Sequence, residues 1–158
     1  MAEGSSSGFE SRVREHHRLV FQVAYSVLRN HADAEDVTQE VFLRAYRQLA
    51  TLRDPERFRA WVARMSWRMA LNRRRGELRA RARDDGWFRS RGPETGVEMH
   101  AALGEAIARL PEELRDTLLL AAVEGLDTRE AAAILEIPEG TVRSRLHTAR
   151  RRLMEALF

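Results

Sequence analysis

The C-terminal stretch GLDTREAAAILEIPEGTVRSRLHTARRRLMEALF, residues 125–158, decides the fold of its half of the chain. Asp127 followed three residues later by Glu130 resembles a capping box, which predicts the start of a short helix. The turn EIP at residues 136–138 ends that helix, and a longer helical pattern runs through residues 139–157. A short helix, a tight turn and a long helix in this order predict a helix-turn-helix.

The long helix has two unlike faces. At about 100° per residue, one narrow stripe is apolar and consists of Val142, Leu146, Ala149 and Leu153. Five arginines lie between residues 143 and 152 with no acid among them, and arginine forks fit guanine edges and phosphates. The outward side therefore predicts a DNA-reading surface, and a basic helix that only packs on its neighbour is the alternative. The candidate residues are Thr141, Arg143, Ser144, His147, Thr148, Arg150 and Arg151.

The composition excludes several classes of protein. The 158 residues are 44% apolar, and no apolar run approaches the roughly 20 residues that cross a bilayer. Residues 1–8 lack the basic start and apolar middle of a secretory signal, so we expect a disordered leader and a cytoplasmic protein without membrane insertion. There is no cysteine and the five histidines are scattered, so we expect no metal site and no cofactor.

A catalytic site finds little support. A chain of 158 residues leaves little room for a deep cleft. The densest acids are Asp33, Glu35, Asp36 and Glu40, yet they spread around their helix and cannot hold a metal or a water together. We therefore expect a binding protein, and an enzyme such as a small nuclease is the disfavoured alternative.

All 27 basic residues are arginine. GC-rich coding explains most of the absence of lysine, but the positions carry information. Eight arginines lie between Arg73 and Arg91 against three acids. Such a segment predicts contact with nucleic acid or another polyanion, or a solvated linker.

Helical periodicity predicts an all-α fold of two small helical domains. Residues 9–75 carry three helical patterns, and Pro55 suits the first turn of the third with Asp54 as its cap. Periodicity fades over residues 76–99, which are rich in glycine and charge, so we expect a flexible linker there. Residues 100–158 form the second domain. In the third helix, the predicted apolar face consists of Phe58, Trp61, Val62, Met65 and Met69.

The second and third helices each carry a candidate binding face. On the second, the residues opposite the predicted buried stripe are Asp36, Gln39, Glu40 and Leu43. An exposed leucine beside acids and an amide indicates a protein-binding patch, although a solvated face is equally consistent. On the third, Trp67 with Arg64 and Arg68 beside it suits contact with unstacked bases and phosphates, unless Trp67 packs under a neighbouring segment.

Three stretches resemble the sigma factors of bacterial RNA polymerase. DAEDVTQEVFLRAYRQL (33–49) resembles region 2.2 of the extracytoplasmic-function (ECF) group of the sigma-70 family, and FRAWVARMSWRMALNRRR (58–75) resembles regions 2.3 and 2.4. LPEELRDTLLLAAVEGLDTREAAAILEIPEGTVRSRLHTAR (110–150) resembles region 4. Each stretch is moderately specific, and the three in the family's order are highly specific.

The resemblance implies a promoter-specificity subunit. Its partners would be the β′ clamp helices and β flap of core polymerase, promoter DNA, and an anti-sigma factor that covers the polymerase-binding faces. Asp36, Gln39, Glu40 and Leu43 would face the clamp helices, and the helix-turn-helix would read the minus-35 element. A flipped base of the minus-10 element would be held by the third helix and the loop before it. The residues implied for minus-10 binding are Leu52, Arg64, Trp67, Arg68, Asn72 and Arg74.

Three departures from the family pattern bear on which promoter is read. Thr148 stands where many members have arginine, Glu136 where they have glycine, and Arg68 where they have asparagine. The promoter sequence therefore does not carry over from relatives. The alternative function is a helix-turn-helix transcription regulator that does not bind core polymerase, which would need a ligand pocket or a self-complementary face.

Overall fold

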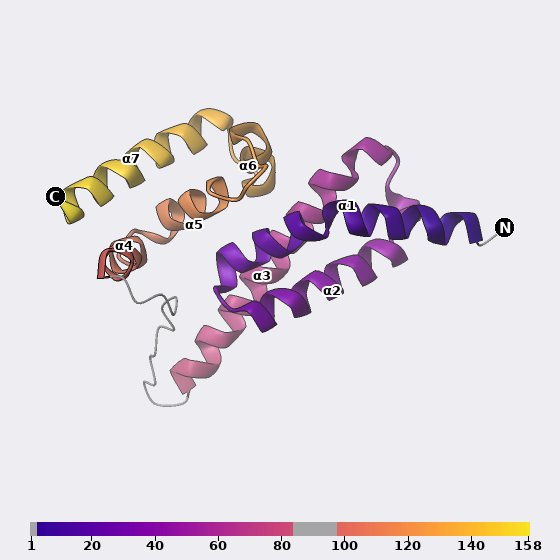
Figure 1. Cartoon of the computed structure of the whole chain (residues 1–158), viewed down its shortest axis with the longest axis horizontal. Helices are drawn as coiled ribbons and strands as arrows, with labels where there is room; N and C mark the ends of the chain where they lie inside the picture. The colour runs from indigo at the N-terminus through magenta and orange to yellow at the C-terminus, as the bar shows by residue number, and fades with distance from the viewer. Residues whose placement is uncertain (1–2, 84–97) are drawn as a thin grey trace. The chain divides into compact units, whose positions relative to one another are not determined.

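The computed structural model describes residues 3–83 and 98–158, and every regular element in these two ranges is helical. Contacts divide the chain into an N-terminal unit, Met1–Arg74 with Val123–Gly125, and a C-terminal unit, Arg75–Ala122 with Leu126–Phe158 (Figure 1). The predicted all-α fold class with two helical parts is confirmed. None of the helices in the described ranges is both long and apolar enough to cross a membrane.

The N-terminal unit is built on three long helices: α1 (Glu3–Leu28), α2 (His31–Arg47) and the part of α3 (Phe58–Arg83) up to Arg74. Short 3-10 turns lie at Leu49–Thr51 and Pro55–Arg57. Side-chain caps fix where helical structure starts. Asn30 Oδ1 accepts a hydrogen bond from Asp33 N at 3.0 Å, and Asp54 Oδ1 accepts one from Glu56 N at 3.0 Å. Asp54 is therefore the cap that the sequence predicts, with Pro55 directly after it.

Branched aliphatic residues form the core of this unit. Val20 and Val23 from α1, Val37 from α2 and Val62 from α3 are fully buried or nearly so. Helix α3 lies close to α1 at the small residue Ser66, whose buried Oγ donates a hydrogen bond to the Val20 carbonyl at 2.7 Å. The predicted buried stripe of α2 is confirmed in full, and its members are Ala34, Val37, Val41 and Ala45.

Two helices are longer than the sequence predicts. Helix α1 begins at Glu3, within the segment predicted as a disordered leader, and Phe9 packs edge-to-face on Tyr46 with ring centres 5.1 Å apart. This contact extends the packing of α1 toward its start. Helix α3 continues to Arg83, past the predicted start of the linker, since arginine, leucine and alanine are good helix formers. Residues 84–97 of the predicted linker lie outside the described residues.

The C-terminal unit consists of α4 (Glu98–Ala108), α5 (Glu112–Ala121), α6 (Thr128–Leu135) and α7 (Glu139–Leu157). Asp127 is the N-cap that the predicted capping box requires, because its Oδ1 accepts a hydrogen bond from Glu130 N at 2.7 Å. Helices α6 and α7 form the predicted helix-turn-helix (Figure 1). The core of this unit includes Leu110, Leu120, Ala131, Ile134, Val142, Leu146 and Ala149.

The turn between α6 and α7 contains a left-handed residue. Glu136 has φ 58° and ψ 41°, and its backbone N–H bonds to the carbonyl of Ala132. Glycine adopts this conformation without steric cost, whereas a residue with a Cβ does not. The sequence thus keeps the turn but places a strained residue at its centre.

Candidate nucleic-acid and protein interfaces

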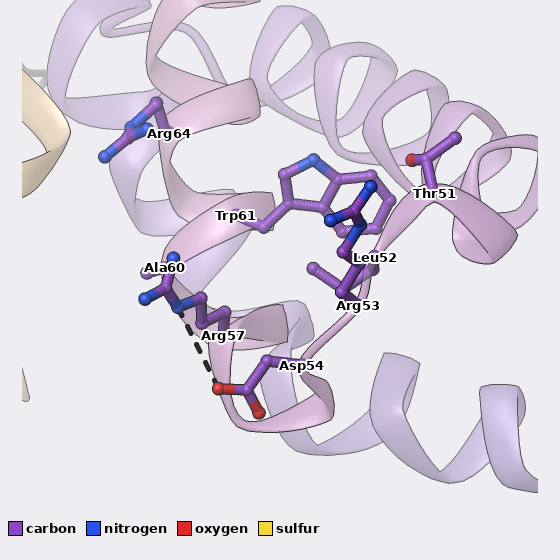
Figure 2. A pocket seen from close by; sticks show the side chains of 8 residues that line it. All are labelled: Thr51, Leu52, Arg53, Asp54, Arg57, Ala60, Trp61 and Arg64. Atoms are coloured by element: carbon purple, nitrogen blue, oxygen red, sulfur yellow. Dashed lines mark ion pairs between the residues drawn. The ribbon is translucent and has the colours of Figure 1, made fainter.

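A hollow of about 640 Å³ lies where the loop before α3 meets the first turns of that helix (Figure 2). One wall comes from the loop and the other from successive turns of α3. Trp61 and Arg64 lie three residues apart on one face of α3 and line the second wall together with Arg57, the last residue of the 3-10 turn before that helix. The full lining is Thr51, Leu52, Arg53, Asp54, Arg57, Ala60, Trp61 and Arg64.

The hollow combines a flat aromatic ring with positive charge. Figure 2 shows the indole of Trp61 beside Leu52 and Arg53, and the ring also meets Phe58 edge-on with centres 6.0 Å apart. Arg53, Arg57 and Arg64 supply three guanidinium groups to the lining. Asp54, the single acid of the lining, lies 3.9 Å from Arg57 Nε. An aromatic platform with a basic rim suits an unstacked base and its phosphate.

The prediction that Trp67 faces outward is wrong. Its side chain is 5% exposed and belongs to the core. The buried face of α3 includes Ala63, Ser66 and Ala70, which the predicted apolar stripe omits, and Trp67 lies on the same side. Small residues carry little apolar signal, so the stripe was placed too far toward Trp61. The tryptophan that lines the hollow is Trp61, which sequence reasoning assigned to the core.

The other predicted minus-10 residues divide into two groups. Leu52 and Arg64 line the hollow, and the exposed Arg68 and Asn72 continue the same side of α3 at four-residue steps from Arg64. Arg74 is half-buried and lies four residues after the buried Ala70, so it shares the core side of α3. Of the six predicted residues, the structure therefore brings Leu52 and Arg64 together at the hollow and places Arg68 and Asn72 further along the same side of α3. It separates Arg74 and Trp67 from them. The spacing of Arg57, Trp61 and Arg64 is the signal that would have revealed the missed lining.

The α2 face has the predicted exposure. Asp36, Gln39 and Glu40 are exposed, and Leu43 is 58% exposed. Sequence reasoning missed Tyr46, which follows Leu43 by three residues and is 56% exposed, so it extends the apolar part of this face.

An arginine bridge joins α3 to the start of α2. Arg73 Nη2 lies 2.9 Å from Asp33 Oδ1 and 3.3 Å from Asp36 Oδ2. The first residue of the arginine-rich segment thus meets acids of its own domain. Asp36, predicted to meet a protein partner, shares that guanidinium with Asp33.

Helix α7 separates its faces as predicted. Val142, Leu146 and Ala149 are buried, and Leu153 is half-buried. On the outward side Thr141 and Thr148 are half-buried, and the exposed residues are Arg143, Ser144, His147, Arg150 and Arg151. The geometry fits a helix that presents one basic side to a groove.

Two of the five arginines of α7 meet acids from outside their own segment. Arg143 Nη2 donates to Glu139 Oε1 at 2.7 Å, one turn earlier in the helix. Arg145 Nη2 lies 3.6 Å from Glu113 Oε2 of α5. No acid lies within residues 143–152, but acids outside that stretch pair with two of its arginines. Arg145 is turned toward the domain rather than outward.

A buried histidine lies in the N-terminal unit. His16 packs against Phe58 with ring centres 5.4 Å apart, and its Nδ1 is buried with no hydrogen-bond partner. Burial lowers the pKa of His16, and the neighbouring Arg59 and Arg12 lower it further against the opposing effect of Glu15. Within the described ranges, no three histidine or acidic side chains gather closely enough to hold a metal ion.

Both units match models of one protein family. The model described as Sigma-70 region 2 matches residues 12–80, which contain most of α1, all of α2 and most of α3. The model described as Sigma-70, region 4 matches residues 100–153, which contain α5, α6 and most of α7. ECF RNA polymerase sigma factor SigE of Mycolicibacterium smegmatis is 33% identical over 98% of this chain and 63% of its own length. The RNA polymerase sigma-H factor of Pseudomonas aeruginosa is 30% identical over 98% of this chain and 88% of its own.

The chain belongs to the ECF group of the sigma-70 family. The ECF RNA polymerase sigma-E factor of Escherichia coli K12 is also 33% identical, over 87% of this chain and 80% of its own. The SigE comparison leaves more than a third of that relative unmatched, because the chain spans 63% of its length.

Solved sigma factors share the fold. RpoE of Bartonella quintana, solved with the anti-sigma factor NepR, matches with a TM-score of 0.74 at 22% identity, covering 95% of this chain and 96% of that one. CnrH, solved with the cytosolic domain of CnrY, matches with a TM-score of 0.68 at 29% identity, covering 99% and 91%. The hollow therefore lies in region 2 and the basic face of α7 in region 4.

Proposed function

We propose that this sigma factor directs core RNA polymerase to promoters by reading the minus-35 element with α7 and capturing a base of the minus-10 element on α3. The observation that carries the proposal is the hollow on α3, where Trp61 stands among three arginines inside region 2. Folding alone does not require a recessed aromatic ring with a basic rim, whereas binding of an unstacked base does. A second basic face in region 4 supplies the other half of promoter recognition.

At the minus-10 element the chain would act by binding a base that has left the DNA stack. Unpairing and unstacking one base costs a few kcal/mol. Stacking of a base on an aromatic side chain returns about 1 to 3 kcal/mol, and guanidinium groups contact the flanking phosphates. Leu52, Trp61 and Arg64 would hold the base, while the exposed Arg68 and Asn72 would contact DNA further along α3. No covalent chemistry is needed, and the chain would work as a binding subunit rather than as an enzyme.

At the minus-35 element the exposed side of α7 would enter the major groove. Arg143 and His147 lie near the start of the helix, where base edges are read, and Ser144 lies beside them. Thr141 and Thr148 flank this group. Arg150 and Arg151 lie further along and would meet phosphates, which strengthens binding to all sequences alike.

The face of α2 would bind the polymerase. Asp36, Gln39, Glu40 and Leu43 would meet the β′ clamp helices, with Tyr46 enlarging the apolar part of the contact, while region 4 meets the β flap. We also propose an anti-sigma partner that covers these faces; RpoE, which shares the fold, was solved in complex with the anti-sigma factor NepR. Because core polymerase and promoter DNA are its proposed partners, the chain would work in the cytoplasm.

Reconstitution with bacterial core polymerase tests the proposal. The full chain should co-purify stoichiometrically with core and should direct transcription from defined promoters, which sequencing of transcript starts will map. A helix-turn-helix regulator that does not bind core would show neither result.

Charge reversal separates the binding face from a solvated one. Asp36→Arg with Glu40→Arg should weaken core binding, while Glu35→Arg, an exposed acid of the same helix outside the patch, should not. All of these variants should keep nearly the wild-type helical content, because Asp36→Arg breaks only one arm of the Arg73 bridge and exposed ion pairs contribute at most about 1 kcal/mol. Equal core affinity for the double variant and the Glu35 variant would remove the α2 face from the proposal.

A further inference from the structure

The first turn of α7 carries an acid that touches a DNA-facing arginine. Glu139 is the first residue of the helix, and its Oε1 accepts a hydrogen bond from Arg143 Nη2 at 2.7 Å. Both side chains remain accessible, with 40% of Glu139 and 67% of Arg143 exposed. The pair is therefore presented on the surface rather than enclosed in the core.

This contact fixes the orientation of a flexible side chain. A free arginine side chain carries about 2 kcal/mol of rotamer entropy, part of which is lost on binding. Guanidinium has five N–H donors in a planar fork, so the bond to Glu139 leaves donors for the two acceptors of guanine. Glu139 can thus hold Arg143 in place before DNA arrives without occupying the group that reads the base.

A second arginine of α7, Arg145, also pairs with an acid, but in a different arrangement. Arg145 lies 3.6 Å from Glu113 of α5 and is 25% exposed, so its acid comes from a neighbouring helix and its side chain turns toward the domain. Glu139 instead precedes Arg143 on the same helix, at the end that contacts base edges in helix-turn-helix proteins. Of these two pairs, only Glu139 with Arg143 would bring a carboxylate to the bases together with its arginine.

We infer that Glu139 is a positioning residue that sets minus-35 specificity by restricting Arg143 to one guanine of the element. The inference rests on the proposed role of α7 as the minus-35 reading helix. A carboxylate beside the fork also repels the acceptor atoms of a wrongly placed purine, so the pair disfavours other registers of Arg143. Removing Glu139 should therefore leave DNA binding in place but broaden the sequences that are accepted.

A promoter library randomised across the minus-35 element, transcribed by holoenzyme made from the full chain and bacterial core polymerase, measures this preference position by position. Glu139→Ala removes the hydrogen bond and the charge, and Glu139→Asp keeps the charge at the helix start but shortens the reach. Glu113→Ala is the matched control, because it removes one negative charge from the other acid that pairs with an α7 arginine. Arg143→Ala identifies the position that depends on Arg143, and thermal melting checks that each variant is folded.

We expect Glu139→Ala and Glu139→Asp to lower the guanine preference about fivefold at the position where Arg143→Ala abolishes it. Glu113→Ala should leave every position unchanged. Full preference in both Glu139 variants, or an equal loss at all positions, would overturn the inference while leaving α7 as the reading helix. If Arg143→Ala loses preference at no position, the proposed role of α7 itself fails, and the inference fails with it.

Discussion

Trp61 and Trp67 lie six residues apart on α3, and truncating each to alanine should separate DNA opening from folding. Trp67 is 5% exposed, so Trp67→Ala should lower the free energy of unfolding of the N-terminal unit by about 3 to 5 kcal/mol. Trp61 is half-buried and meets Phe58 edge-on. Its truncation loses that aromatic pair, worth about 0.5 to 1.5 kcal/mol, and a part of its buried area.

For promoter opening, Trp61→Ala should have the larger effect and Trp67→Ala the smaller one. Loss of a stacking platform worth about 1 to 3 kcal/mol reduces open-complex formation about 5- to 150-fold. Trp61→Phe keeps an aromatic face and should restore most of the opening, which makes it the matched control for Trp61→Ala.

Urea unfolding gives the stability of each variant, and permanganate reactivity of unpaired thymines gives the fraction of open promoter in reconstituted holoenzyme. Both are measured below the melting temperature of the weakest variant, so that all chains are folded when DNA is added. Wild-type opening by Trp61→Ala would refute the role of the hollow. Wild-type stability of Trp67→Ala would refute its placement in the core.

Three further changes test features of the fold. Glu136→Gly should raise the free energy of unfolding of the C-terminal unit by about 0.5 to 1 kcal/mol in urea titration, because glycine relieves the left-handed backbone, and an unchanged or lower stability would contradict this reason. Burial lowers the pKa of His16 below 6.5, so the unfolded chain binds a proton that the folded chain does not. The free energy of unfolding of the N-terminal unit should therefore be highest above pH 6.5 and fall as the pH drops below it. In urea titrations across pH, His16→Gln should flatten this fall, whereas His147→Gln, in the other unit, should not. Arg73→Ala should cost about 0.5 to 1 kcal/mol by breaking the bridge to α2, and equal melting of Arg73→Ala and the exposed control Arg75→Ala would argue against it.

Local signals made much of the fold predictable. Asp54 and Asp127 accept hydrogen bonds from backbone N–H groups two and three residues away, so sequence spacing alone places them. Valine and leucine at helical spacing mark the buried stripes of α2 and α7, and the alanines that lie within these stripes are buried with them. The turn at Glu136 was also predictable, although its left-handed conformation on a non-glycine residue was not.

The errors arose where the deciding contact is distant in sequence or carried by small residues. Phe58 and Val62 of the predicted apolar face of α3 are buried, but Ala63, Ser66 and Ala70 give little apolar signal, so the predicted face is rotated from the observed core toward Trp61 and away from Trp67. The pairing of Arg145 with Glu113 joins α7 to α5 and is not visible in the sequence around either residue. Arg73 likewise meets acids of α2 that lie about forty positions earlier.

The hydrogen bond from Ser66 to the Val20 carbonyl bears on how promoter preference can be altered. It holds α3 against α1 at a distance that a larger side chain at Ser66 would disrupt, so this side of the helix is closed to change. On the opposite side of α3, Ala60, Arg68 and Asn72 are exposed. A synthetic sigma factor with a new minus-10 preference could therefore be made by replacing these exposed residues as a set, while the buried residues of α3 are kept unchanged.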